Sequence, residues 1–218
     1  MPPPPPGDAA TPVAAGQPPR GEVSLTKGRP VSLAKGQRVS LVKNGNQALT
    51  RVRMGLGWDP VKRGGGVFGK REAQIDLDAA AVLFAGGQPA DVAFYNQLRS
   101  KDGSVQHMGD NRTGEGEGDD EVIVVDLTAV PPQVDVVMFV VTSYEGQTFE
   151  QVQNAYCRLV DAADGELARY QLAGGMAYTA LAMAKIYRAD GGWKLQALGE
   201  GLQARTPIAA APLLTRWL

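Results

Sequence analysis

Short runs rich in valine, isoleucine, leucine and alanine recur along this chain, and a turn signal follows most of them. The clearest runs are 49–58, 75–84, 92–98, 122–127, 136–143, 155–161, 166–172, 178–188 and 193–199. Many of the 27 glycines and 15 prolines fall between these runs, and Asp164-Gly165 and Asp190-Gly191-Gly192 are typical hairpin turns. Strands at this spacing, with one helical turn or two at 148–154, predict an all-β fold: a two-sheet β-sandwich with one or two short helices.

The N-terminal region differs from the rest of the chain. Residues 1–22 are rich in proline, alanine and glycine, and they cannot bury enough apolar surface to offset the entropy of ordering. We therefore expect a disordered tail at 1–22 and one folded domain at 23–218. A Val-Ser-Leu unit then occurs three times at a spacing of eight residues, starting at Val23, Val31 and Val39. We interpret these units as short strands or hairpins, with one copy a redundant duplication in the linker.

Composition and charge exclude several classes of protein. No apolar run approaches the ~20 residues that cross a bilayer, and residues 1–20 lack the apolar stretch of a secretory signal. The single cysteine, Cys157, allows no internal disulfide, which favours the cytoplasm. Residues 1–71 carry 12 Lys/Arg against 3 Asp/Glu. No RNA-binding or helix-turn-helix pattern accompanies this positive charge, so we expect no sequence-specific binding of nucleic acid.

The acidic segment Gly109–Glu121, GDNRTGEGEGDDE, is the most informative part of the sequence. Residues 110–121 contain six acids and one arginine, and their glycines let the backbone curl and turn its carbonyls inward. Calcium takes oxygen ligands of these kinds in flexible geometry, and a divalent cation would relieve the repulsion between the acids. The segment predicts a calcium site with one or two ions on a loop between strands. An EF-hand does not fit, because Arg112 and Glu115 occupy positions that need an acid and a glycine.

A second acidic pair, Asp76 and Asp78, lies two residues apart at the start of an apolar run. On a strand both carboxylates face the same way, and buried acids need a partner. A metal shared with the acidic segment would supply one; an exposed strand face with lysine or arginine partners is the alternative. Asp59 is a weaker, third candidate, for which a plain Asp-Pro turn is the alternative.

Several of these motifs together resemble one known family. They are Gly55-Leu56-Gly57-Trp58-Asp59, Asp76-Leu77-Asp78-Ala79, Phe94-Tyr95-Asn96, 102–107, 109–121, 148–152 and Glu166-Leu167-Ala168-Arg169-Tyr170. The chain resembles the TerD family of tellurium-resistance and stress-response proteins over about residues 22–200. The resemblance implies a bacterial β-sandwich that binds calcium at acidic loops. The positions it implies as metal ligands are Asp76, Asp78, Asp110, Asn111, Glu115, Gly116, Asp119, Asp120 and Glu121.

The function expected from this reasoning is that of a calcium-binding stress-response protein, a non-enzymatic binding or scaffold module with other stress-response proteins as partners. It would be cytoplasmic, with or without peripheral contact with the inner face of the membrane. One alternative is a metal-dependent hydrolase or phosphoryl-transfer enzyme, in which the ion is a Lewis acid and His107 or a carboxylate is the base. Another is calcium-dependent contact with a membrane surface. His107 and Cys157 are more simply interpreted as packing residues.

Overall fold

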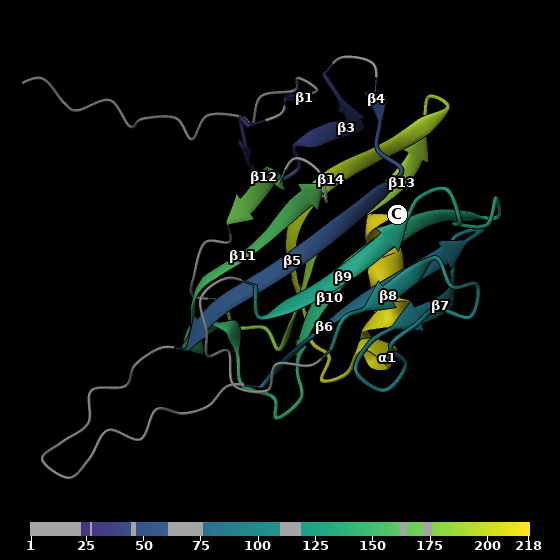
Figure 1. Ribbon diagram of the computed structural model, residues 1–218. Helices are drawn as coiled ribbons and strands as arrows, with labels where there is room; N and C mark the ends of the chain where they lie inside the picture. Colours follow the sequence, from purple (N-terminus) through teal and green to yellow (C-terminus); the bar gives the residue numbers. More distant parts are fainter. Residues whose placement is uncertain are drawn as a thin grey trace, which may run out of the picture.

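The computed structural model describes residues 23–26, 28–44, 47–60, 76–109, 119–161, 165–171 and 176–218. This part of the chain forms two β-sheets and three short helical segments (Figure 1), which confirms the expected all-β, two-sheet fold. The first seven strands are β1 (Val23–Leu25), β2 (Val31–Leu33), β3 (Arg38–Lys43), β4 (Gln47–Ala48), β5 (Arg51–Pro60), β6 (Leu77–Ala85) and β7 (Gln88–Ala93). The others are β8 (Val105–His107), β9 (Glu121–Asp126), β10 (Val134–Ser143), β11 (Val152–Asp161), β12 (Gly165–Gln171), β13 (Ala180–Ala189) and β14 (Gly192–Leu202).

Most strand neighbours are antiparallel, as expected for a chain joined by short turns. The eight-stranded sheet has the order β1-β3-β14-β13-β10-β6-β7, with β4 paired to β3. The six-stranded sheet has the order β2-β12-β11-β5-β9-β8. Only β1–β3 and β2–β12 are parallel among the pairs of the described residues. The predicted turn at Asp190-Gly191 joins β13 to β14, and both residues have positive φ, 51° and 76°.

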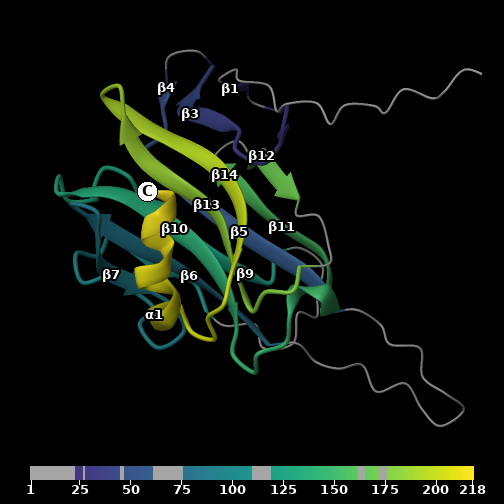
Figure 2. The ribbon, with the colours of Figure 1, turned by 180° about the vertical axis from the view of Figure 1, so that it is seen from behind.

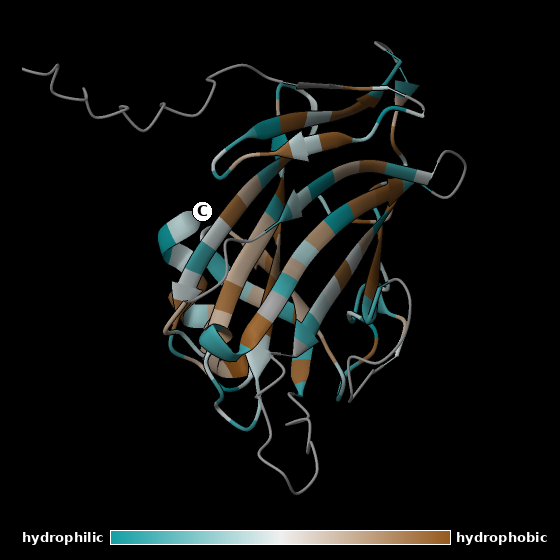
Figure 3. Ribbon diagram, turned by 90° about the vertical axis from the view of Figure 1, so that its left-hand side faces the viewer, coloured by the Kyte–Doolittle hydropathy of each residue, from teal (hydrophilic) through white to brown (hydrophobic). Residues whose placement is uncertain are grey.

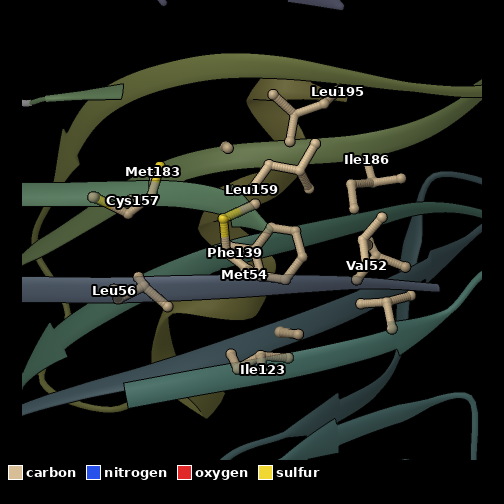
Figure 4. Packing of buried hydrophobic residues seen from close by; sticks show 14 of the residues in the cluster. Val52, Met54, Leu56, Ile123, Phe139, Cys157, Leu159, Met183, Ile186 and Leu195 are labelled. Carbon is tan, nitrogen blue, oxygen red and sulfur yellow. The ribbon is translucent and has the colours of Figure 1, made fainter. Parts of the chain in front are cut away.

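The main core lies between the two sheets. Along β5 every second side chain is buried, and Val52, Met54 and Leu56 face their counterparts from the other sheet, among them Phe139 of β10 (Figure 4). Figure 3 shows hydrophilic and hydrophobic residues alternating along the strands of the sheet nearest the viewer. This alternation is what a sheet with one buried face requires.

The outer face of the eight-stranded sheet carries a second core. Its C-terminal cover consists of α1 (Pro207–Ala210) and the 3-10 helix η2 (Ala211–Trp217), which lie across this face in Figure 2. The cover explains why β10 is an almost continuous apolar run, since the strand is buried on both faces. The Thr206 hydroxyl caps α1 by accepting from the backbone N–H of Ala209. This C-terminal segment was not predicted from the sequence, although Thr206-Pro207 is a helix-start signal. The helical turn that the sequence predicted at 148–154 is present as the 3-10 helix η1 (Phe149–Gln151).

The three Val-Ser-Leu units all form strands, but no hairpin joins one unit to the next. The first and third, β1 and β3, pair in parallel in the eight-stranded sheet, whereas the second, β2, crosses to the six-stranded sheet. Leu25, Leu33 and Leu41 all enter the main core. The expectation of a hairpin holds only after the third unit, where β3 pairs antiparallel with β4. Between the units it was wrong, as was the expectation of a redundant linker copy, because each connection carries the chain to the opposite sheet, where the leucine is buried.

One strand was also misplaced. The sequence predicted a strand at 92–98, but β7 ends at Ala93, and Phe94 and Gln97 close a tight turn through reciprocal backbone hydrogen bonds of 2.9 Å. The expected tail at 1–22 and the acidic residues 110–118 lie outside the described residues. None of the helices in the described part is long and apolar enough to cross a membrane.

Candidate functional site

The candidate site lies where β9 begins, against β5 and the start of β6. The backbone N–H of Asp120 donates to the carbonyl of Leu56 at 2.8 Å, which extends the β5–β9 ladder by one residue. The Glu121 carboxylate reaches β6 and accepts from the backbone N–H of Ala79. These contacts fix the last two acids of the predicted calcium segment in the fold.

Glu121 points into the sandwich. Its side chain is 0% exposed, and it shares a strand face with the core residues Ile123 and Val125. Its Oε2 lies 3.4 Å from Nε2 of His107, whose Nδ1 accepts from the backbone N–H of Gly109. Because Nδ1 is an acceptor, the neutral ring carries its proton on Nε2, the atom that faces Glu121. Glu121 thus ties β9 to β6 by a hydrogen bond and lies against His107 at the end of β8.

Asp119 points to the outer face of the six-stranded sheet. Nε of Arg158 donates to its Oδ1 at 2.6 Å, and Nη2 donates to its Oδ2 at 2.9 Å. The carboxylate lies over Gly55, where a Cβ atom would come within 2.1 Å of Oδ2. The hydrogen bond with Asp119 is the main cause that raises the pKa of the Arg158 guanidinium. A bidentate pair of this kind is among the stronger ionic contacts in proteins.

The Arg158 guanidinium is held from a second side by Glu166. Nη1 of Arg158 donates to Glu166 Oε2 at 3.2 Å, and Arg169 donates to both oxygens of Glu166 at 2.9 and 2.8 Å. The Arg169 guanidinium also lies 4.2 Å from the centre of the Tyr156 ring. The hydrogen bond from Arg169 is the main cause that lowers the pKa of Glu166, with a smaller contribution from Arg158. One ionic network therefore joins the segment just before β9 to β11 and β12; its members are Asp119, Arg158, Glu166 and Arg169.

The network predicts a pH effect on stability. Because the pKa of Glu166 is lowered in the folded state, its contribution is present above the ordinary value of 4.5 and is lost as the pH falls through the folded value. Glu166→Gln should lower the free energy of unfolding at pH 7 by about 1 kcal/mol. The loss should shrink toward zero below the folded pKa. Urea denaturation at several pH values measures both effects, and an equal loss at pH 7 and at pH 3 would contradict the explanation.

Asp120 has a different environment from that of Asp119. Its Oδ2 accepts from the backbone N–H of Trp58 at 2.8 Å. Burial is the main cause that raises the pKa of Asp120, the Trp58 hydrogen bond opposes it, and the negative charges of Asp59 and Asp119 add to the increase. The negative charges of neighbouring acids thus disfavour the ionised form of the Asp120 carboxylate.

Asp76 and Asp78 lie at the start of β6. Asp78 is 5% exposed and shares a strand face with Ala80 and Val82, on the outer side of the eight-stranded sheet. It is opposite Thr142 of β10, whose hydroxyl oxygen is buried without a hydrogen-bond partner among the described residues. One carboxylate oxygen each of Asp76 and Asp78 is also buried. The alternative of a solvent-exposed acidic strand face does not apply to Asp78.

The described residues do not form a metal site by themselves. No group of three or more His, Cys, Asp or Glu side chains suited to a metal ion occurs in the described ranges, which leave out 110–118. Asp110, Asn111, Glu115 and Gly116 all lie outside those ranges. The available donors, from Asp76, Asp78, Asp120 and Glu121, are carboxylate oxygens, so they fit a hard cation such as calcium in kind. A complete shell would need ligands from 110–118 as well.

Two residues considered in the sequence have little access to a ligand. Cys157 is buried in the main core, and burial raises the pKa of its thiol to about 12. Its reactive thiolate form is therefore scarce at neutral pH. The His107 side chain is 0% exposed.

Sequence reasoning missed Arg158 and Gly55, which hold Asp119. The signal for Gly55 was available, since glycines inside a strand often mark a close approach by another group. Gly57 follows the same rule, because a Cβ there would come within 2.4 Å of the Tyr156 ring. Nothing in the local sequence pairs Arg158 with an acid 39 residues away.

Comparison with known proteins gives one consistent assignment. The TerD domain model matches residues 30–209. The chain is 46% identical over 165 residues to the tellurium resistance protein TerZ of Serratia marcescens, covering 74% of this chain and 85% of that protein. It is 42% identical over 170 residues to the stress response protein SCP2 of Bacillus subtilis (strain 168), covering 72% and 85%.

Solved structures agree with this assignment. A homologue of telluride resistance protein (TerD), SCO6318 from Streptomyces coelicolor A3(2), aligns with a TM-score of 0.59 at 25% identity, covering 75% of this chain and 96% of that chain. SAV2460, a protein of unknown function, aligns with a TM-score of 0.63 at 25% identity, covering 76% and 96%. The sandwich, the matched motifs and these relatives lead to one conclusion: this chain belongs to the TerD family.

Proposed function

We propose that this chain is a calcium-binding protein of the stress response that contributes to tellurite resistance as a binding or scaffold module. Relatives that bear tellurium-resistance and stress-response names support the physiological role. Under this proposal the protein acts in the cytoplasm with other stress-response proteins as its partners.

The observation that carries the calcium proposal is the crowding of acids at the exit of the acidic segment. Asp59 and Asp119 lie close enough to Asp120 for their charges to act on it, and burial disfavours its charged form further. A divalent cation beside Asp120 would reverse both effects. When bound, the cation would neutralise negative charge of the acidic segment.

The chain's own residues contribute position and donor type. Asp120 is oriented by the Trp58 N–H, and Glu121 is held by the Ala79 N–H. The remaining ligands would come from the predicted set Asp76, Asp78, Asp110, Asn111, Glu115 and Gly116. Carboxylates on rigid strand ends, joined to a glycine-rich segment, suit the flexible coordination of calcium.

The proposal is tested by thermal unfolding and calorimetry in EDTA and in calcium. Because a ligand that binds only the folded state stabilises it by mass action, calcium at 100 times its Kd should add about 2.7 kcal/mol. Asp120→Asn should remove most of this gain, whereas Asp135→Asn, at an exposed position of β10, should keep it. Absence of both binding heat and a thermal shift at millimolar calcium would refute the proposal.

The form of the hydrolase alternative that uses His107 as its base gains no support from the described residues. Its base would have to reach a substrate, and His107, the only histidine of the chain, is buried. Calcium-dependent sedimentation with anionic vesicles would test the membrane alternative.

A further inference from the structure

Asp119 and Asp120 are adjacent in the sequence but have different surroundings. Both carboxylate oxygens of Asp119 accept from Arg158, and Oδ1 also lies 3.4 Å from the Tyr156 hydroxyl. The Asp119 side chain is 8% exposed. The guanidinium takes one lone pair of each Asp119 oxygen, and the Tyr156 hydroxyl lies at Oδ1 as well, so little of the carboxylate is left for a metal ion.

The fold provides space specifically for this pair. Gly55 leaves room for the Asp119 carboxylate, and Gly57 leaves room for the Tyr156 ring beside it. Any side chain at Gly55 would collide with the carboxylate, because even a Cβ atom would lie 2.1 Å from Oδ2.

Arg158 is also held by a residue other than Asp119. Glu166 accepts from its Nη1, and Arg169 fixes Glu166 through two further hydrogen bonds. Because the guanidinium is fixed from its far side, little side-chain entropy is lost when it binds Asp119. Asp119 is therefore bound to a partner that is itself fixed, and we call a residue held in this way an anchor.

Asp120 is placed differently. One of its oxygens accepts from the backbone N–H of Trp58, and its carboxylate lies near Asp59 as well as Asp119. The backbone bends at Asp120, and the two neighbouring carboxylates have different partners, Arg158 for Asp119 and the Trp58 N–H for Asp120.

We propose that Asp119 is a positioning residue rather than a calcium ligand: Arg158 clamps it, this clamp fixes the exit of the acidic segment, and coordination is left to Asp120 and the other predicted ligands. The inference rests on the proposed calcium site and removes one residue from its ligand set. It gives Arg158 a supporting role, in which removing the arginine weakens calcium binding.

The two possible roles of Asp119 predict opposite effects for Arg158→Gln. If Asp119 were a ligand, the arginine would compete with calcium, and its removal would tighten calcium binding. If Asp119 is an anchor, removal loosens the segment and should raise the Kd for calcium about tenfold, as is typical for groups that orient metal ligands. Asp119→Asn should raise the Kd by a similar factor, and Asp120→Asn should abolish the binding heat.

Measurements without metal provide the second readout. In EDTA, Asp119→Asn and Arg158→Gln should each lower the melting temperature by about 3 °C. The double variant should lose no more than either single variant, because both break the same contact. Asp120→Asn is the matched control and should keep or raise the melting temperature, since it removes a charge from among acids.

The experiment is isothermal titration with calcium chloride plus thermal unfolding in EDTA, on the full chain and these four variants. Weaker calcium binding by Arg158→Gln, together with a shared loss of melting temperature, supports the clamp. Tighter binding by Arg158→Gln, or additive losses in the double variant, overturns it. If calcium produces no binding heat with the unmodified chain, the calcium proposal alone is refuted. The melting temperatures in EDTA then decide whether Arg158 clamps Asp119.

Discussion

Replacing Phe139 with alanine is expected to lower the free energy of unfolding by about 3–5 kcal/mol, the usual cost of removing a buried aromatic ring. Phe139 is 0% exposed in the middle of β10. Figure 4 shows it amid Met54, Leu159 and Ile186 of the main core. Its neighbours in register are Ala81 on β6 and Ala184 on β13, so the ring fills space that two alanines leave open.

The neighbouring alanines are the reason why the site cannot close around the missing ring. A small side chain at Phe139 would leave a cavity bounded by three consecutive strands of the eight-stranded sheet. Denaturation by urea measures the loss. Leu98→Ala is the control, because Leu98 is 47% exposed and its truncation should cost less than about 0.5 kcal/mol. A loss below about 1 kcal/mol for Phe139→Ala would show that the core is not packed as described.

Glu121→Ala should have the second largest effect, a loss of about 3 kcal/mol in EDTA. The change removes the acceptor of the Ala79 N–H and leaves a cavity beside His107. The β6–β7 ladder begins only at Ala81, so no β7 residue replaces the lost acceptor. A buried N–H without an acceptor retains the full cost of its desolvation.

Glu121→Gln separates the hydrogen bond from the charge. The amide keeps an oxygen that can accept from Ala79, so it should retain most of the stability that alanine loses. Chemical denaturation in EDTA measures both variants without interference from any bound cation. Equal losses for alanine and glutamine would show that the charge, rather than the hydrogen bond to β6, is what stabilises the fold.

The acidic residues at this end of the sandwich have at least two tasks. Asp119 and Glu121 hold elements together, one through Arg158 on the outside of a sheet and the other through Ala79 in the interior. Asp120 lies between them and interacts with other acids. A run of acids in a sequence therefore does not translate directly into a list of metal ligands.

Much of the fold was predictable from short-range patterns. Runs such as 136–143 and 155–161 became strands β10 and β11 because β-branched and aromatic residues suit a pleated, buried surface. The turn at Asp190-Gly191 formed as expected, because the small residues tolerate positive φ. The motifs around Gly55, Asp76 and the acidic segment also sufficed to identify the TerD family.

The sequence by itself determined most of the strands, the hairpin turn at Asp190-Gly191, the family and the concentration of acids at 110–121. Only the tertiary structure decided which sheet each Val-Ser-Leu unit joins, and that a C-terminal helical segment buries the second face of β10. It also decided that Asp119 meets Arg158 whereas Asp120 meets Trp58. The physical reason is range: strand and turn preferences act between near neighbours, but the partner of a charge is chosen by strand register, which brings together residues far apart in the chain.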